Sequence, residues 1–444
     1  MRLRVCSLKA RVESKAEEFI RLHKRFIMPS TMVSYSLVAS EAHGSIVKDV
    51  NGKAYIDFSS AVAVANIGHS HPKVVQAVKE QAERLIHFAG NDFYNELQPK
   101  LAQKLVSITP GNSAKKVFFS NSGAESVECA FKLARWHKRR PGMISFLGAF
   151  HGRTFGALSL SACKPAHKAF FHPLVPYVVH VPYPYCYRCS FGLQYPECGL
   201  QCVSYLEDVV MESYPMEDFA GLIVEPIQGE AGYIVPPDEF MPRLEKACRE
   251  HGLLLIVDEV QTGFGRTGRM FACEHYGVEP DILCLSKALA AGLPMGATVA
   301  RAEVADWQEG AHSNTFGGNL LACAAALANI EVIEEEKLWE RAAHLGEHAL
   351  KRLREFMEES RIVGDVRGKG LMIGVELVRD KTTRARAIKE TEQVTVEAFK
   401  RGLILLPVGH NCIRVAPPLN IPNDLLDRGL DILVEAVKVV EKGV

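Results

Sequence analysis

The chain has 444 residues, of which 48% are hydrophobic and 23% charged, a composition typical of soluble globular proteins. Its 52 lysines and arginines balance 52 aspartates and glutamates, so the net charge points to neither nucleic acid nor an anionic membrane surface. No run reaches the roughly 18 apolar residues of a transmembrane helix. The length predicts two or more lobes.

The N-terminal 19 residues contain basic side chains but lack the apolar core and the small-residue cleavage site of a secretory signal. We therefore expect a cytoplasmic protein. Most cysteines lie singly in apolar runs, as Cys129, Cys248, Cys284 and Cys323 do, and these are expected to be small core residues.

The N-terminal elements are predicted from periodicity and turn signals. Asn51-Gly52 separates two alternating runs and indicates a hairpin, and Pro72 suits the first turn of a helix. The predicted elements are a helix over 12–27, strands over 44–50 and 54–58, and a helix over 72–85.

The middle of the chain alternates short apolar strands with helices, which predicts a mainly parallel sheet covered on both faces. The predicted strands are 116–119, 143–146, 220–224, 253–257 and 282–285, with helices up to residue 136 and over 240–251.

After about residue 330 the pattern changes to a smaller α+β lobe. A single long charged helix is predicted over 330–358. It is followed by strands over 362–366, 371–377, 403–406 and 412–415, with a further helix before 403 and a final helix over 425–440.

Polar side chains follow the strands of the predicted parallel sheet, where sites gather at the carboxyl ends. Asp258 directly follows the run 253–257, and Lys287 follows 282–285. A carboxylate in such a place needs a cationic partner, although it also serves as a helix cap or a structural ion pair. A desolvated lysine is able to attack a carbonyl as the free amine, whereas an arbitrary lysine more often lies at the surface.

Three further segments fall at strand ends. The segment Ser120–Glu125 exposes backbone amides at a helix N-terminus, which suits a phosphate, although serine and glycine are also plain caps. The segment Phe150–Thr154 offers an aromatic beside a histidine as a platform for a flat ring, and Glu225–Glu230 follows another strand. A phosphate cradle, a ring platform, an acid and an amine together meet the needs of pyridoxal phosphate.

At these residues the chain resembles the class III pyridoxal-phosphate aminotransferases, most specifically over IVDEVQTGFGRTGRMFACEHYGVEPDILCLSKALAAGLPMGA. The likeness extends from IDFSSAVAVANIGHSHPKV to IRVAPPLN. It implies the type I fold of these α/β enzymes, in which a large, seven-stranded, mainly parallel sheet domain is joined by a small lobe built from both chain ends. The expected segments are 1–75, 76–335 and 336–444.

The resemblance implies how the cofactor is held. Lys287 is expected to be the Schiff-base lysine, Asp258 the partner of the pyridinium nitrogen, and Thr315 the residue that reaches the phosphate in the partner subunit of a homodimer or tetramer. The other expected cofactor contacts are Ser122, Gly123, Ala124, Phe150, His151, Glu225 and Gln261.

The resemblance also implies the substrate contacts. Arg414 is expected to bind the α-carboxylate of an amino acid or a 2-oxo acid, with Glu230 as its partner when that carboxylate is absent. Arg153 is expected to bind the distal carboxylate of an ω-amino acid, and Val62 falls where 4-aminobutyrate enzymes have an aliphatic residue. The expected reaction passes an amino group from a 4-aminobutyrate-like donor to 2-oxoglutarate through pyridoxamine phosphate.

Three other functions are compatible with parts of the sequence. A racemase or epimerase on the same fold shares every cofactor contact, and the retention of Arg153 and Glu230 favours transamination over it. A dinucleotide-dependent oxidoreductase is suggested by the G-x-G-x-x-G string 263–268, but this string does not directly follow a strand. A non-enzymatic chain is disfavoured by the joint presence of Lys287, Asp258 and Arg414.

The segment 182–202 is an insert that the resemblance does not explain. Its four cysteines have a spacing that permits structural zinc, disulfides or free thiols in a surface loop. They are Cys186, Cys189, Cys198 and Cys202. No catalytic metal is expected.

Overall fold

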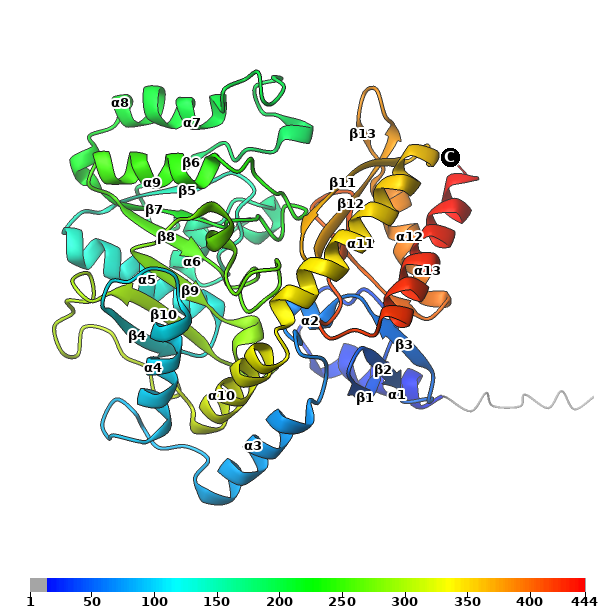
Figure 1. Ribbon diagram of the computed structural model, residues 1–444, viewed down its shortest axis with the longest axis horizontal. Coiled ribbons are helices and arrows are strands. Elements are labelled where there is room, and N and C mark those ends of the chain that lie inside the picture. Colours follow the sequence, from blue (N-terminus) through cyan, green and yellow to red (C-terminus); the bar gives the residue numbers. More distant parts are fainter. Residues whose placement is uncertain (1–13, 444) are drawn as a thin grey trace, which may run out of the picture.

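A seven-stranded sheet forms the centre of the larger lobe of the computed structural model, which describes residues 14–443 (Figure 1). Its order is β4-β10-β9-β8-β7-β5-β6. Only β10 runs antiparallel to its neighbours within this described sheet, so the predicted mainly parallel sheet is confirmed. The strands are β4 (Lys115–Ser120), β5 (Gly142–Phe146), β6 (Val178–Val181), β7 (Phe219–Val224), β8 (Leu254–Asp258), β9 (Ile282–Leu285) and β10 (Gly296–Arg301).

Two of these strands, β6 and β10, were not predicted. The β10 sequence GATVAR contains small residues and ends on arginine, and β6 is an edge strand of only four residues. Both therefore lack the long apolar run that marks a central strand.

Helices cover both faces of this sheet. On one face α5 (Gly123–Lys138) packs through residues such as Val127 and Leu133, with α6 (Phe155–Leu160) beside it. On the other face lie α9 (Phe240–Glu250) and α10 (Leu320–Glu335), with α4 (Leu97–Ile108) packed against α10. Burial on both sides explains why β5 and β7 are entirely buried.

The smaller lobe contains strands from both ends of the chain, as expected. In one sheet β14 (Leu403–Ile404) runs parallel to β3 (Ala54–Asp57), which pairs with β2 (Ile46–Asp49) and then β1 (Ala39–His43). The second sheet has β11 (Val363–Lys369), β12 (Met372–Asp380), β16 (Cys412–Val415) and β15 (Leu406–Val408), with β13 (Ala385–Arg386) on β12. The helices of this lobe are α11 (Leu338–Glu359), α12 (Ile388–Lys400) and α13 (Asn423–Glu441).

The prediction of one long helix over 330–358 was wrong. Residue Lys337 has φ 48°, in the left-handed region, and separates α10 from α11. The helix α10 is buried on several sides within the larger lobe, whereas α11 has one buried stripe and crosses to the smaller lobe (Figure 1). The two helices thus belong to different packing environments, which requires the break.

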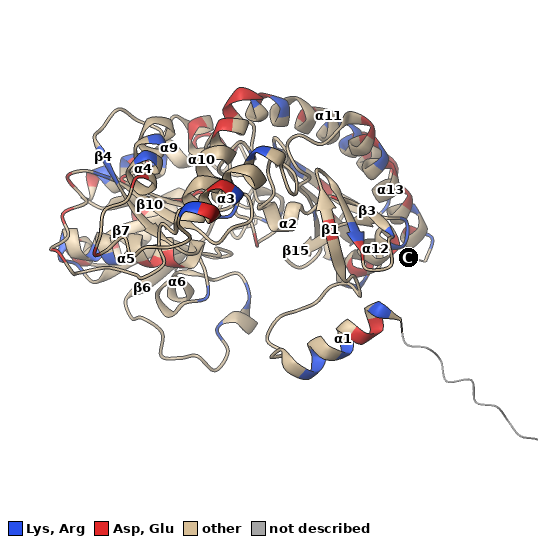
Figure 2. Cartoon of the chain, turned by 90° about the horizontal axis from the view of Figure 1, so that it is seen from below, with Lys and Arg blue, Asp and Glu red and all other residues tan. Residues whose placement is uncertain are grey.

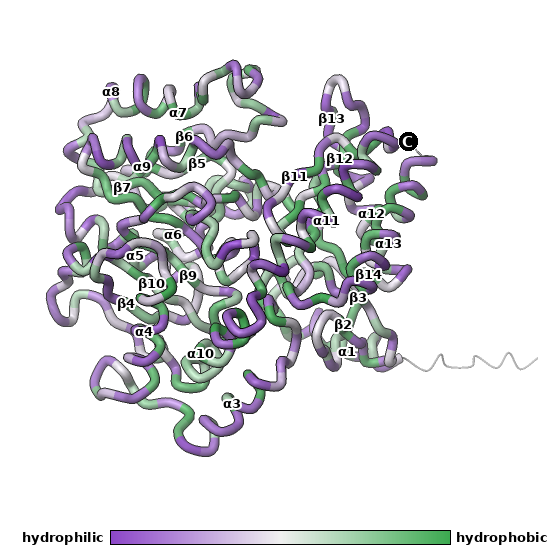
Figure 3. The backbone as a smooth tube through the Cα atoms, in the orientation of Figure 1, coloured by the Kyte–Doolittle hydropathy of each residue, from purple (hydrophilic) through white to green (hydrophobic). Residues whose placement is uncertain are grey.

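The N-terminal segment leads into the smaller lobe. A capping box of Ser14 and Glu17 begins α1 (Lys15–Phe26), which buries none of its residues and projects from the body of the chain (Figure 2). Then come α2 (Ser60–Ala63) and α3 (Pro72–Arg84), the latter largely hydrophilic (Figure 3). No helix among the described residues is long and apolar enough to cross a membrane. The predictions for residues 1–13 lie outside the described part.

Short helical turns connect the remaining segments. They are η1 (Pro165–His167), η2 (Cys186–Arg188), α7 (Gln201–Tyr205), η3 (Leu206–Val210), α8 (Met211–Ser213), η4 (Met216–Asp218), η5 (Ala272–Tyr276) and η6 (Lys287–Ala290).

Candidate active site

Three titratable side chains meet at the carboxyl edge of the large sheet. Glu225, Asp258 and Lys287 follow or end β7, β8 and β9, which are neighbours, so the parallel topology brings them together. They line a pocket of about 310 Å³. Its lining residues are Gly123, Ala124, Phe150, His151, Gly152, Arg153, Glu225, Asp258, Val260, Gln261, Ser286 and Lys287.

Lys287 begins η6 with φ 44°, a strained backbone conformation for a lysine. The preceding Ser286 donates from Oγ to the Met295 carbonyl (2.6 Å), which holds the turn. Burial, followed by the nearby charge of Arg414, lowers the pKa of the Lys287 amine to about 8. The turn therefore presents an amine that is uncharged at mildly alkaline pH.

Asp258 and His151 form a buried pair at the floor of the pocket. Asp258 Oδ2 lies 2.7 Å from His151 Nδ1, and Oδ1 accepts the Val260 amide (3.0 Å). Both side chains are at most 4% exposed. Within the described chain, His151 Nε2 is buried without a hydrogen-bond partner. One carboxylate is thus fixed in orientation by two donors while facing the pocket.

Glu225 stabilises the loop that bears Phe150. Its Oε1 accepts the Phe150 amide (2.9 Å) and its Oε2 accepts the Gly229 amide (2.8 Å). Burial, with the negative charge of Asp258 as a lesser cause, raises the pKa of Glu225 to about 7. Glu225 lines the predicted pocket, but both of its oxygens are used by backbone amides.

The start of α5 forms a close-packed cradle at the pocket. Ser122 is the N-cap, and its Oγ accepts the Glu125 amide (3.2 Å). A Cβ on Gly123 would lie 2.8 Å from Val260 Cγ1, and one on Gly152 would lie 2.7 Å from Ala124 Cβ. Only glycine fits at both positions, so backbone amides can approach an anion at this helix terminus.

The pocket also offers contacts for a flat polar ring. In the described chain Gln261 Oε1 is buried without a hydrogen-bond partner. The ring of Phe150 packs edge-on against His167, with centroids 5.6 Å apart, and the Arg153 guanidinium lies 5.2 Å from the Phe150 centroid. An amide lacking a partner, an aromatic wall, a carboxylate and an amine around a phosphate cradle fit pyridoxal phosphate.

A charged triad lies near Lys287. Arg414 Nη2 is 3.2 Å from Glu230 Oε2, and Lys164 Nζ is 2.6 Å from Glu230 Oε1. Among residues 14–443, Arg414 Nε and Nη1 are buried without partners. The Arg414–Glu230 contact was predicted. Lys164 was missed, because nothing in its local sequence relates it to a glutamate 66 residues away.

Three other predicted residues have distinct places. Arg153 lines the pocket, with its Nη2 3.3 Å from His167 Nε2. Val62 is 36% exposed and belongs to a left-handed turn in which residues 60–63 all have positive φ. It is not among the residues that line the pocket. Thr315 is exposed and also outside the pocket of this single chain.

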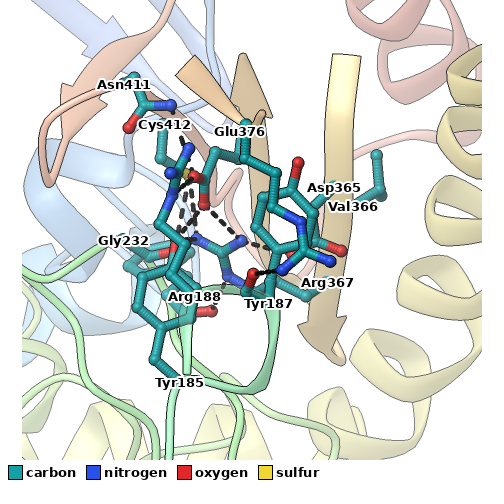
Figure 4. A network of polar contacts seen from close by, with 12 residues as sticks. Tyr185, Tyr187, Arg188, Gly232, Asp365, Val366, Arg367, Glu376, Asn411 and Cys412 are labelled. Carbon is teal, nitrogen blue, oxygen red and sulfur yellow. Dashed lines mark hydrogen bonds and ion pairs between the residues drawn. The ribbon is translucent and has the colours of Figure 1, made fainter. Parts of the chain in front are cut away.

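A buried polar network supports the triad from the smaller lobe (Figure 4). Its centre is Glu376 on β12, which receives Arg188 Nε (2.5 Å), Arg367 Nη1 (2.8 Å) and the Tyr185 hydroxyl. Arg367 also donates to the Gly232 carbonyl (2.7 Å), two residues after Glu230. The network therefore joins the 182–202 insert, the smaller sheet and the loop that bears Glu230.

The cysteine insert has no metal-binding geometry in the structure. Cys186, Cys189, Cys198 and Cys202 line one small cavity, and burial raises the thiol pKa of Cys186 and Cys202 to about 11. Across residues 14–443 no three His, Cys, Asp or Glu side chains are placed to hold a metal ion, and the cysteines are free. The zinc and disulfide alternatives therefore gain no support, and the structure fits free thiols.

The glycine string 263–268 is not a dinucleotide turn. It follows β8 without opening a helix, and its Arg266 is fully buried. Arg266 donates to the carbonyls of Leu371 (3.0 Å) and Pro417 (2.6 Å) and to Asn66 Oδ1 (2.6 Å). The string therefore connects distant parts of the chain through the internal hydrogen bonds of Arg266.

The fold and pocket define a fold-type-I enzyme that binds a phosphorylated aromatic aldehyde beside a reactive amine. Residues 27–437 match the profile of the family described as aminotransferase class-III. A leucine/methionine racemase of Thermococcus litoralis is 43% identical, covering 97% of both chains. A probable 4-aminobutyrate aminotransferase of Bacillus subtilis is 40% identical, covering 89% of this chain and 92% of that one.

Solved structures agree with this relationship. An aminotransferase of Bacillus anthracis has a TM-score of 0.89 at 32% identity, covering 95% of this chain and 98% of that one. The chain belongs to the class III aminotransferases, a family of pyridoxal-phosphate-dependent enzymes.

Proposed function

We propose that this enzyme transfers an amino group from an ω-amino acid of the 4-aminobutyrate kind to a 2-oxo acid such as 2-oxoglutarate. The observation that carries this proposal is the Arg414–Glu230 pair, together with the partner-free donors of Arg414. A free guanidinium fork suits an α-carboxylate. Glu230 neutralises Arg414 when an ω-amino donor has no carboxylate there, so the pair fits substrates of both kinds.

Arg153 supports the same substrate class. Arg153 lines the pocket, and Arg414, which is not among the lining residues, is a second cation whose charge acts on Lys287. A dicarboxylate such as 2-oxoglutarate offers one carboxylate to each arginine, and 4-aminobutyrate offers its single carboxylate to Arg153. Val62, which is 36% exposed and is not among the pocket-lining residues, is proposed to contact the aliphatic part of the substrate.

The positions of the cofactor residues support the roles proposed for them. Bound pyridoxal phosphate supplies an electron-withdrawing ring that stabilises negative charge left on the substrate Cα after proton loss. We propose that Lys287 binds the cofactor through its amine and moves the Cα proton. Asp258, oriented by His151, keeps the ring nitrogen protonated. The phosphate contacts are assigned to Ser122, Gly123 and Ala124, the ring contacts to Phe150 and Gln261, and the positioning of the Phe150 loop to Glu225.

We infer a homodimer, or a tetramer of such dimers, in which Thr315 reaches the partner's cofactor phosphate. Thr315 is exposed beside Phe316, which is 60% exposed. Phe316 lies near His87, and Asn319 donates to the Ile86 carbonyl, so the segment 85–94 adjoins it. This exposed apolar patch comprises Ile86, Phe88, Phe93, Tyr94 and Phe316. A patch of this kind on a globular protein typically marks an interface.

A second candidate is an amino-acid racemase or epimerase. It is favoured by the 43% identity to a leucine/methionine racemase over nearly the full length of both chains. Racemisation begins with the same loss of the Cα proton, but the proton returns to the opposite face of Cα and no second substrate is needed. Racemisation gives Arg153 no role in binding a distal carboxylate, so transamination remains the first proposal.

One experiment separates the two candidates. Purified holoenzyme is mixed in single turnover with 4-aminobutyrate, ornithine, L-alanine, L-leucine or L-glutamate, without any 2-oxo acid. Formation of pyridoxamine phosphate, measured by chromatography, supports amino transfer and identifies the donor. Formation of the D-amino acid with no pyridoxamine phosphate would establish the racemase and contradict the first proposal.

A further inference from the structure

Glu230 is shared between two cations, one on each carboxylate oxygen. Lys164 Nζ lies 2.6 Å from Oε1, and Arg414 Nη2 lies 3.2 Å from Oε2. Burial raises the pKa of this carboxyl, but the charges of Arg414 and Lys164 outweigh it, so the net shift is downward. Glu230 is thus an ionised side chain with two partners, and the contact with Lys164 is the shorter one.

Arg414 is held only loosely by this arrangement. Its contact with Glu230 exceeds the 2.7–2.9 Å of a strong charge-assisted hydrogen bond, and it also contacts the Pro407 carbonyl at 3.5 Å. The guanidinium lies 5.9 Å from the centroid of the Tyr233 ring. Of its donors, Nε and Nη1 have no partner in the part of the chain described. A substrate carboxylate therefore finds a guanidinium with donors available, provided that Glu230 can give up its own contact.

The obstacle to that exchange is the carboxylate left behind. If Arg414 were the only cation on Glu230, its departure would leave a largely buried carboxylate without a partner, which is strongly destabilising. Lys164 removes this obstacle because it stays on the opposite oxygen when Arg414 turns away. Its side chain is 30% exposed, and the backbone two residues before it is anchored, because Ala162 N donates to the Ala149 carbonyl (2.7 Å).

We propose that Lys164 is a specificity-determining positioning residue that holds Glu230 while Arg414 binds the α-carboxylate of the substrate. This rests on the proposed function of the Arg414–Glu230 pair. Lys164 acts through Glu230, without touching the reacting atoms. Its effect is to favour substrates that have an α-carboxylate, while substrates that lack one leave the Arg414–Glu230 contact in place and do not depend on it.

The test compares Lys164→Met with Lys168→Met in the holoenzyme. Lys168 lies on the same segment but contacts the Ser159 carbonyl at 3.5 Å, not Glu230, so its replacement removes the same charge without touching the triad. Dissociation constants come from spectral titration of the bound cofactor with L-alanine, L-leucine and 4-aminobutyrate. Lys164→Met should weaken binding of L-alanine and L-leucine by about tenfold and change that of 4-aminobutyrate by less than about twofold.

The conservative variant and the control complete the design. Lys164→Arg should restore binding of L-alanine, and Lys168→Met should resemble wild type. Equal weakening for all three ligands, or no weakening for L-alanine, would overturn the proposal. If wild type forms no pyridoxamine phosphate with any donor, amino transfer itself fails. The binding of L-alanine then still decides the role of Lys164, because a racemase also has to bind the α-carboxylate of its substrate.

Discussion

Asp258 Oδ2 lies 2.7 Å from His151 Nδ1, and its other oxygen accepts the Val260 amide, so this carboxylate has a single orientation at the pocket floor. We expect Asp258→Asn to lower the single-turnover rate by about 100-fold or more, because a neutral amide cannot stabilise a protonated ring nitrogen. Stopped-flow spectroscopy of the holoenzyme measures this rate. Asp238→Asn, which removes a charge 76% exposed at the surface, is the matched control. Equal rates for the two variants would contradict the assigned role.

The lowered pKa of Lys287 predicts the pH dependence of cofactor attachment. The reacting form is the neutral amine, so the rate at which cofactor-free enzyme takes up pyridoxal phosphate should rise with pH and level off above about pH 8. An ordinary lysine would still gain reactivity up to about pH 10. Absorbance of the attached cofactor, followed over this range, provides the measurement.

Two variants test whether the pH dependence comes from the lowered pKa of Lys287. Arg414→Met removes a positive charge that lowers the pKa of Lys287, so the midpoint should move to higher pH. Lys287→Ala should show no covalent attachment at any pH. A wild-type rate that still climbs steeply above pH 9 would show that the amine is not perturbed in this direction.

The buried network around Glu376 predicts a large effect on stability. Glu376→Gln removes the negative charge facing Arg367 and Arg188, whose side chains are 11% and 17% exposed. Arg188 would then face only an amide, while Arg367 would keep its contact with Asp365, and the loss should cost about 3 kcal/mol. The apparent melting temperature of the holoenzyme should fall clearly. Glu41→Gln, in an exposed pair with Lys48, should leave it unchanged. Similar melting temperatures for both variants would contradict the importance of the network.

The exposed apolar patch predicts the oligomeric state. Phe88→Asp combined with Phe316→Asp should convert the proposed dimer largely to monomer, because charges would then lie in the core of the proposed interface. Sedimentation velocity measures the change, and activity should fall with it if Thr315 acts across the interface. Val439→Asp, an exposed apolar position on α13, is the control. Dimers that persist in the double variant would place the interface elsewhere.

The sequence alone predicted a mainly parallel sheet, five of its seven strands and the polar residues at its edge. Short apolar strands alternating with helices predict a parallel sheet, and in such a sheet the residues following adjacent strands meet. Glu225, Asp258 and Lys287 are therefore neighbours in the pocket, as their positions indicated. The sequence did not predict elements with a weak or short apolar run, such as β10. It also did not predict the break at Lys337, which lies inside a continuously helical pattern.

Contacts between distant segments were decided only by the tertiary structure. Lys164, Glu230 and Arg414 come from three parts of the chain, separated by 66 and 184 residues, and Arg266 is buried against carbonyls more than 100 residues away. Periodicity and turn chemistry describe the backbone within a window of a few residues. Which charged side chains face one another depends on how distant segments pack. Packing within the larger lobe placed Lys164 on Glu230, and packing of the smaller lobe against it brought Arg414 to the same carboxylate.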